Sequence, residues 1–314
     1  MARLRTAACL AGLILAACGR REETAPPVAR AWEIMGTVFS AGAWGRDSAA
    51  LVAAVMRAHD SVRLVDSLLS PFRDDSEISR LNREAGSGQR EAVSPTFAAV
   101  LGEALRVARA SGGAFDPTLR DWRGVEFDSA ARTVRLRRGL RLDFGGIAKG
   151  YALDRAALAL EGVADSAVLN LGGQLLVLAP VGASSRAAPD AQRSWPVGIA
   201  DPDRPLSALA LIEVPAGRFS VSTSSQAEQP GHIRDPRTGR PAARARSVTV
   251  VAPSGSAADA WSTALFVLGC DSALDVAERV GVSALCADDR VRWTRDLDGR
   301  VSLPTDSAGP RRGP

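Results

Sequence analysis

Helix-like and strand-like segments alternate irregularly along this chain, and predicted hairpins outnumber strand–helix–strand units. This order favours an α+β fold, with largely antiparallel sheets flanked by helices, over a doubly wound fold. Apolar residues at helical spacing, together with capping signals, predict helices over residues 48–69, 75–82, 94–111, 147–160, 257–268 and 272–280. Short apolar runs between turn residues predict strands over 31–44, 125–128, 133–137, 167–171, 197–200, 208–214, 219–221, 247–251, 282–285, 291–294 and 300–303.

The composition is typical of a globular protein, with 46% hydrophobic and 24% charged residues. The formal net charge is +4, and no basic block with interleaved aromatic residues occurs, which argues against a nucleic-acid partner. The sequence contains neither a Gly-x-Gly-x-x-Gly fingerprint nor a Walker loop, so the standard nucleotide motifs do not apply.

The first residues have the features of an export signal. Two arginines precede an apolar stretch over 7–17 that is too short to span a bilayer, and it ends in Leu15-Ala-Ala-Cys18. Small residues before a cysteine resemble a bacterial lipoprotein signal. We therefore expect a signal peptide over 1–17, lipid on Cys18, a tether over 18–30, and an exported protein anchored to the membrane and facing the periplasm. An ordinary signal peptide with a chance cysteine is the alternative.

Two further cysteines, Cys270 and Cys286, fall in the predicted globular part. An oxidising compartment permits a disulfide. However, Cys270 lies at a predicted helix end and Cys286 in a predicted strand, and buried free thiols are an equally good interpretation.

Lys149 is the only lysine beside 38 arginines, and it lies in the run Asp143-Phe-Gly-Gly-Ile-Ala-Lys149-Gly. Its ammonium is a compact point charge, whereas arginine carries a wide planar fork. Gly145 and Gly146 precede a predicted helix, whose free amides can face an anion. The run predicts a loop entering a helix, with one cation for a phosphate or carboxylate. A compositional accident on a surface helix is the alternative.

His232 is one of two histidines, and it lies in a predicted loop beside Asp235 and two arginines. Histidine is the usual general base near neutral pH, although a turn histidine that only binds local backbone would look the same. His59 lies within a long predicted helix, where a structural or surface role is favoured.

Asp259 and Thr263 are four residues apart on a predicted helix and therefore share a face. A carboxylate and a hydroxyl are hard oxygen ligands of the kind that bind Mg²⁺. Alternatively, Asp259 only caps that helix.

Eight segments in order form a distinctive set. They are Met35-Gly-Thr-x-x-Ser40, Asp75-Ser-Glu77 with Leu81-Asn82, Phe115-Asp-Pro-Thr118, Asp143 to Lys149-Gly, Asn170-Leu-Gly-Gly173, Thr223-Ser224, His232 to Gly239, and Ala258-Asp259 to Thr263. Together they closely resemble the FAD:protein FMN transferase family of ApbE type. The resemblance implies one ApbE-like, T-fold-like catalytic domain over residues 31–303, followed by a flexible tail over 304–314.

The resemblance also implies an activity. Such enzymes bind FAD and Mg²⁺, move the FMN half onto a threonine or serine hydroxyl of an acceptor protein, and release AMP. Acceptors in the family include electron-transfer subunits, such as those of sodium-pumping quinone reductases. Some members instead hydrolyse FAD to FMN and AMP, and a non-enzymatic FAD-binding lipoprotein is a third possibility.

By the same resemblance, the Asp259 carboxylate, the Thr263 hydroxyl and the Gly146 carbonyl hold Mg²⁺, and Ser262 reaches it through water. Asp143 and Lys149 hold FAD, and His232 activates the acceptor hydroxyl. The flavin and adenine pockets are lined by Met35, Phe72, Ala114, Phe115, Asp116 and Ile233.

One segment departs from the family pattern. The family usually reads Thr-Ser-Gly followed by an aromatic residue, whereas Thr223-Ser224 is followed here by Ser225-Gln226. The stretch from there to His232 is also short. We expect this difference to change acceptor recognition or to weaken transfer relative to hydrolysis.

Overall fold

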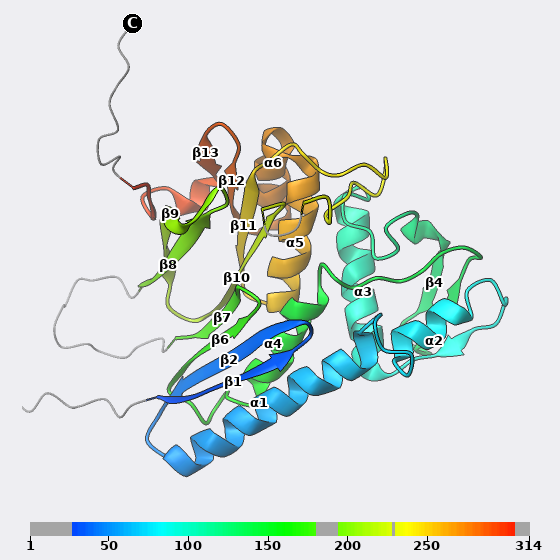
Figure 1. Ribbon diagram of the computed structural model, residues 1–314, viewed down its shortest axis with the longest axis horizontal. Helices are drawn as coiled ribbons and strands as arrows, with labels where there is room; N and C mark the ends of the chain where they lie inside the picture. Colours follow the sequence, from blue (N-terminus) through cyan, green and yellow to red (C-terminus); the bar gives the residue numbers. More distant parts are fainter. Residues whose placement is uncertain (1–26, 180–193, 228–229, 305–314) are drawn as a thin grey trace, which may run out of the picture.

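An eight-stranded antiparallel sheet forms the centre of the computed structural model, which describes residues 27–179, 194–227 and 230–304 (Figure 1). Helices cover one face of this sheet and a small three-stranded sheet covers the other. The strands of the large sheet, in spatial order, are β1 (Val28–Ile34), β2 (Thr37–Trp44), β6 (Ser166–Leu171), β7 (Gln174–Leu178), β10 (Arg218–Ser225), β11 (Ser247–Ala252), β12 (Ser283–Ala287) and β13 (Val291–Trp293).

The two smaller sheets are also antiparallel. One packs on the large sheet and the other stands beside α3 (Figure 1). The first consists of β14 (Val301–Ser302), β9 (Arg204–Pro215) and β8 (Ser194–Asp201), and the second of β3 (Glu91–Ala92), β5 (Thr133–Leu136) and β4 (Val125–Asp128). The predicted α+β class with antiparallel sheets is therefore confirmed.

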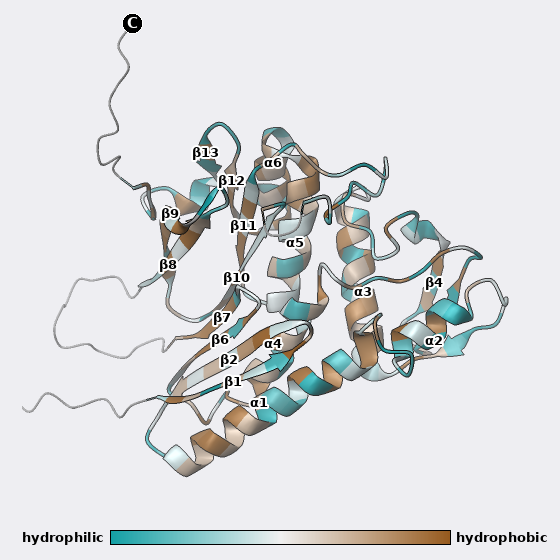
Figure 2. Ribbon diagram, in the orientation of Figure 1, coloured by the Kyte–Doolittle hydropathy of each residue, from teal (hydrophilic) through white to brown (hydrophobic). Residues whose placement is uncertain are grey.

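The helices follow the predicted pattern closely. They are α1 (Ser48–Leu69), α2 (Glu77–Arg83), α3 (Pro95–Ala110), α4 (Ala148–Leu158), α5 (Gly255–Leu268) and α6 (Cys270–Val280). The bounds of α1 match the prediction because Asp47 caps its first turn, accepting the Ala50 N–H at 3.0 Å. Figure 2 shows teal and brown residues mixed along α1, as expected of a helix with one buried face.

Two hairpins differ from the predicted strands. The single strand expected over 31–44 is the pair β1 and β2, because Met35 and Gly36 both adopt positive φ, of 53° and 69°, and reverse the chain. The sheet also begins at Val28, so residues 28–30 of the expected tether belong to it. Strand β7 was not predicted, and it follows a second tight turn at Gly172 and Gly173, with φ of 57° and 86°.

Helices α4 and α5 cross at an unusually close distance. A Cβ on Gly150 would lie 2.0 Å from the Gly255 carbonyl oxygen, so only glycine fits at this crossing. Asp154 of α4 reinforces the contact, since its carboxylate accepts the Gly255 and Ser256 N–H groups at 2.7 and 2.9 Å. The crossing brings the start of α4, with Lys149, against the first turns of α5.

Cys270, the first residue of α6, forms a disulfide with Cys286 of β12. Of the two interpretations that the sequence left open, a disulfide or two free thiols, the structure shows the disulfide. Within residues 27–179, 194–227 and 230–304, no helix is both long enough and apolar enough to cross a bilayer. The predicted signal peptide, Cys18, most of the tether and tail residues 305–314 lie outside the described residues.

Candidate functional site

A cavity of about 690 Å³ opens between the helical layer, the large sheet and β8. Its wall is built from the loops before β4 and α4, the β6–β7 turn, β8, β10, the loop after β10 and one face of α5. The predicted site residues on this wall are Ala114, Phe115, Asp116, Asp143, Gly146, Lys149, His232, Ile233, Asp259 and Thr263. Sequence segments up to 149 residues apart, such as Ala114 and Thr263, therefore meet in one site.

Two predicted pocket residues, Met35 and Phe72, do not reach this cavity. Met35 occupies the tight β1–β2 turn, and its side chain packs against the hydrophobic core. Phe72 lies in the turn after α1 and is 95% exposed. In this structure neither residue lines the pocket, because their backbone positions direct them elsewhere.

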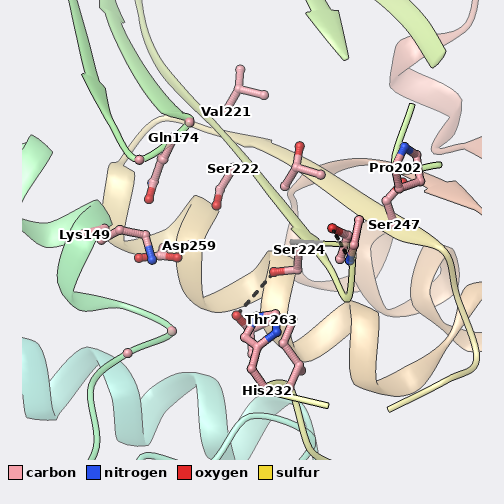
Figure 3. Close-up of a pocket in the computed structure, with 18 of the residues that line it drawn as sticks. Lys149, Gln174, Pro202, Val221, Ser222, Ser224, His232, Ser247, Asp259 and Thr263 are labelled. Atoms are coloured by element: carbon pink, nitrogen blue, oxygen red, sulfur yellow. Dashed lines mark hydrogen bonds between the residues drawn. The ribbon is translucent and has the colours of Figure 1, made fainter. Parts of the chain in front are cut away.

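Asp259 is a buried carboxylate at the start of α5. It is 5% exposed, and its Oδ2 accepts the Gly150 N–H at 3.0 Å. Burial raises the pKa of Asp259, and the nearby Lys149 ammonium and the Gly150 and Lys149 amides only partly oppose this shift. Figure 3 shows Lys149 and Asp259 together at one end of the pocket. The carboxylate is therefore not a simple helix cap.

Thr263 lies one helical turn beyond Asp259 and close to Gly146. A Cβ on Gly146 would be 3.0 Å from Thr263 Oγ1, so the backbone of residue 146 approaches that hydroxyl directly. Mg²⁺ is typically held by one or two carboxylates, neutral oxygens and substrate phosphates rather than by a protein cage. The described residues contain no cluster of three or more His, Cys, Asp or Glu suited to a metal. The single carboxylate with neighbouring neutral oxygens thus fits Mg²⁺ bound together with a phosphate ligand.

The hydroxyl of Ser262 points toward β10. It is fully buried, lies 2.9 Å from Ser224 Oγ and 3.2 Å from Ser222 Oγ, and also bonds the Asp259 carbonyl. Ser224 in turn lies 3.4 Å from Thr263 Oγ1, the contact drawn in Figure 3. In the described structure Ser262 therefore joins α5 to the sheet, and it is not on the cavity wall.

The loops carrying Asp116 and Asp143 hold each other in place. Asp116 Oδ1 accepts the N–H and hydroxyl of Thr118, both at 2.7 Å, and Oδ2 accepts the Trp122 N–H. The Asp143 N–H donates to the Pro117 carbonyl at 2.7 Å, while its carboxylate accepts the Gly145 N–H. These bonds shape the floor of the pocket without using a ligand.

The Asp75–Asn82 motif proves to be a support for that floor. The Asn82 side chain makes two hydrogen bonds with the backbone of Leu142, of 2.6 and 3.0 Å, directly before Asp143. Glu77 accepts the N–H and hydroxyl of Ser94, the cap of α3. Both side chains act on structure at a distance from the cavity.

His232 lies on an exposed loop that borders the cavity, between Gly231 and Ile233. The nearby Asp235 is held by Arg237 at 2.8 Å, and this hydrogen bond lowers the pKa of Asp235. The other histidine, His59, stacks on Trp32 at 4.4 Å, and burial lowers its pKa. The structural role predicted for His59 is thus confirmed.

The polar wall residues that were not predicted from the sequence include Gln174 and Asp201. Gln174 is 3% exposed, and its amide nitrogen donates to the Gly255 carbonyl at 2.9 Å, while its Oε1 has no partner among the described residues. Asp201, at the end of β8, is 3% exposed and bound by Arg204 and Arg246. Gln174 gave one signal, since it is polar in the otherwise apolar strand Gln-Leu-Leu-Val-Leu.

The sequence of this chain is similar to those of known proteins from one family. The ApbE family model matches residues 35–122 and 118–286. The FAD:protein FMN transferase of Treponema pallidum (strain Nichols) is 33% identical, over 91% of this chain and 91% of the relative. That of Haemophilus influenzae is 26% identical, over 85% and 87%.

Solved structures agree in fold. The ApbE protein of Thermotoga maritima matches with a TM-score of 0.76 at 23% identity, over 87% of this chain and 99% of that one. The flavin transferase ApbE of Vibrio cholerae matches with a TM-score of 0.71 at 25% identity, over 88% and 100%. On the sequence match over most of its length, this chain belongs to the ApbE family.

Proposed function

We propose that this protein transfers the FMN moiety of FAD, with Mg²⁺, to a threonine or serine hydroxyl of an acceptor protein and releases AMP. The carrying observation is that one cavity gathers His232, Lys149 and the Asp259–Thr263 pair. The names of the similar proteins support flavin transfer. The cavity volume of about 690 Å³ lies within the range of small-molecule sites.

The reaction is a phosphoryl-type displacement. The acceptor oxygen bonds to the FMN-side phosphorus, the bond from that phosphorus to the bridging oxygen breaks, and AMP leaves with that oxygen. The proton of the acceptor hydroxyl passes to the His232 imidazole, which is suited to this role near neutral pH. His232 stands at the exposed border of the cavity, where an acceptor segment can approach.

The other wall residues serve FAD and the metal. Lys149 supplies a cation, and the Asp143 loop orients the cofactor against the start of α4. Asp259, Thr263 and the Gly146 carbonyl would hold Mg²⁺, which supplies charge neutralisation at the pyrophosphate. Burial raises the pKa of Asp259, and the Lys149 ammonium partly opposes that rise, which favours the ionised carboxylate that a metal needs.

The test combines the protein with FAD, Mg²⁺ and a small acceptor domain carrying a candidate threonine or serine. Transfer gives a covalent fluorescent flavin band on the acceptor and equimolar AMP. His232→Ala should lower the transfer rate roughly 10²- to 10⁴-fold while FAD binding persists. His59→Ala, the matched control, should transfer at nearly the wild-type rate, because His59 lies outside the cavity.

A second candidate is hydrolysis of FAD to FMN and AMP. The Ser225-Gln226 departure and the short stretch before His232 favour it. If AMP and FMN accumulate while no acceptor is labelled, hydrolysis replaces transfer as the function. FAD binding without AMP release, unaffected by His232→Ala, would instead identify a flavin-binding lipoprotein.

We further propose export and lipid anchoring at Cys18, supported by the small residues before that cysteine. This location would give the enzyme access to acceptors such as membrane-bound electron-transfer subunits. Mass spectrometry of the mature N-terminus and cell fractionation test the proposal. A Cys18→Ser variant that still fractionates with membranes and carries the same N-terminal mass would contradict it.

A further inference from the structure

Gln226 follows directly after β10 and reaches across the loop that carries His232. Its amide nitrogen donates to the Ile233 carbonyl at 2.8 Å and to the Ala242 carbonyl at 3.1 Å. Its amide oxygen accepts the Gly231 N–H at 2.8 Å. One half-buried side chain therefore bonds both neighbours of His232 and the opposite side of the loop.

These contacts fix the orientation of the Gln226 amide. Both hydrogens of the nitrogen face carbonyl oxygens, and the oxygen faces an N–H, so a flipped amide would lose all three bonds. The network is specific for glutamine because it needs two donors and one acceptor in one plane. A carboxylate of equal length would keep the acceptor and lose both donors.

The loop is otherwise a narrow hairpin of its own. The Ala242 N–H donates to the Ile233 carbonyl at 3.0 Å, the Asp235 N–H donates to the Arg240 carbonyl at 2.8 Å, and Arg234 pairs with Pro241 as an isolated bridge. Gln226 bonds the open end of this hairpin, at the carbonyls of Ile233 and Ala242, and connects it to the end of β10.

Strand β10 is a firm support for such a link. It is hydrogen-bonded to β7 on one side and to β11 on the other. Through Ser224 it also contacts Ser262 and Thr263 of α5. A series of contacts thus runs from Thr263, on the expected metal side of the cavity, through Ser224 and the β10 backbone to Gln226 and the two residues that flank His232.

We propose that Gln226 is a positioning residue that holds His232 at a fixed place relative to Asp259 and Thr263. This inference rests on the proposed role of His232 as the base. It also gives a physical meaning to the Ser225-Gln226 departure, because the glutamine secures the loop across the short stretch before His232. The position of the base then depends in part on one side-chain amide.

The primary variant is Gln226→Met, which keeps the length of the side chain and removes all three bonds. Loss of alignment at a reacting group of this kind lowers rates by up to about 10²-fold, so we expect a 10- to 100-fold fall in kcat. The KM for FAD and its binding affinity should stay near wild type. Gln89→Met, in an exposed segment before β3, is the matched control and should leave kcat unchanged.

Gln226→Glu adds a signature in the pH profile. An ionised carboxylate would face the carbonyls of Ile233 and Ala242, whereas the protonated acid donates to one of them. The activity of this variant relative to wild type should therefore fall as the pH rises, and that of Gln226→Met should be lowered equally at all pH values. A loss that is merely structural would lower the thermal midpoint and show no such pH dependence.

A readout independent of activity comes from the histidines, since the chain has only two. Protein labelled with ¹⁵N-histidine gives two sets of imidazole nitrogen signals, one for each histidine, assigned with His232→Ala. Gln226→Met should shift or broaden the His232 signal and leave that of His59 unchanged. An unchanged His232 signal would overturn the positioning role, whether or not the protein proves to be a transferase.

The double variant Gln226→Met/His232→Ala separates the two hypotheses further. If Gln226 acts through His232, the added substitution causes no further loss of kcat relative to His232→Ala alone. A further 10-fold loss in that background would contradict the positioning role while leaving the proposed function intact. If wild-type protein forms neither labelled acceptor nor AMP, the proposed function fails and the histidine signals still decide the role of Gln226.

Discussion

Two buried aspartates line opposite walls of the same cavity and have opposite electrostatic surroundings. Asp201, on β8, is 3% exposed and accepts the Asp203 N–H and the guanidinium groups of Arg204 and Arg246 at 3.0 to 3.1 Å. Led by the Asp203 N–H, these donors hold the pKa of Asp201 below its ordinary value of 3.8. Asp259, on α5, is 5% exposed, and burial raises its pKa.

This difference distinguishes a structural carboxylate, Asp201, from the carboxylate that we propose binds Mg²⁺, Asp259. Asp201 has its charge balanced within the protein, so its ionised form stabilises the fold. Burial disfavours the charged form of Asp259, and its neighbours oppose this effect only in part; groups with such shifted pKa values are concentrated at functional sites. The two walls should therefore respond to substitution in opposite ways.

The largest expected effect belongs to Asp259→Asn. Loss of this carboxylate should lower Mg²⁺-supported AMP release by about 10³-fold, comparable to removing a preorganised charge-stabilising group. The metal-free variant should melt at a higher temperature than wild type at pH 7. Because the folded-state pKa of Asp259 lies above its ordinary value of 3.8, its ionisation destabilises the fold as the pH rises through that interval.

Calorimetry in the presence of a chelator checks this sign at pH 7 and again near pH 4. The gain from asparagine should shrink at the lower pH, because a larger share of wild-type Asp259 is protonated there than at pH 7. If metal-free Asp259→Asn melted below wild type at pH 7, ionised Asp259 would stabilise the fold as Asp201 does, and the contrast between the two aspartates would be wrong.

Gly150→Ala disturbs the Asp259 wall through the helix crossing. The new methyl group would meet the Gly255 carbonyl, so α4 and α5 must separate and the Gly150 N–H must move away from Asp259. We expect a loss of about 3 kcal/mol in the free energy of unfolding, as for overpacked cores. Denaturant titration measures it.

Gly198→Ala on β8 is the stability control for that substitution. Its added Cβ has no neighbour within 4 Å, and its φ is not in the positive range. The free energy of unfolding should change by less than about 0.5 kcal/mol. Equal losses for both alanine variants would mean that the crossing is not a special constraint.

Asp201→Asn tests the opposite wall. The variant leaves Arg204 and Arg246 without a charged partner at this position, and the thermal midpoint should fall by about 4 °C at pH 7. Since the folded-state pKa of Asp201 is lowered, its stabilisation is fully present above 3.8 and is lost as the pH falls through the lowered value. Thermal melts from pH 7 to pH 3 should show the two proteins converging in acid. A constant difference across that range would contradict the charge-based explanation.

The sequence predicted most elements whose signals are local. Helix α1 was predicted with correct bounds because its cap and its buried face are both encoded within its own residues. The β1–β2 turn was missed because Met35 adopts a positive φ that few residues other than glycine favour. Strand β7 was missed because it is a run of only five residues, Gln174–Leu178, that begins with a polar side chain.

The sequence motifs predicted which loops come together at the site. The roles of individual residues became clear only from their contacts in the structure. The roles of Gln174 and Asp201 depend on partners 81 and 45 residues away, Gly255 and Arg246, which no local pattern can supply. Phe72 shows the reverse case, since the family resemblance placed it in a pocket while the turn after α1 leaves it in solvent. Local sequence patterns therefore do not predict which residues from different layers of the fold come into contact in the site.

The smallest expected effect comes from Lys149→Arg, which keeps the charge and changes its shape. A guanidinium is wider than an ammonium, and residue 149 adjoins the tight Gly150–Gly255 crossing. We expect FAD affinity to weaken roughly fivefold, about 1 kcal/mol, as measured by quenching of flavin fluorescence without Mg²⁺. Lys149→Met, the matched comparison, should weaken FAD binding further and raise the pKa of Asp259 above its already raised value, because the ammonium partly opposes the effect of burial. Unchanged FAD affinity in Lys149→Arg would show that only the positive charge of residue 149 matters, through its effect on Asp259, and that the shape of the side chain does not affect FAD binding.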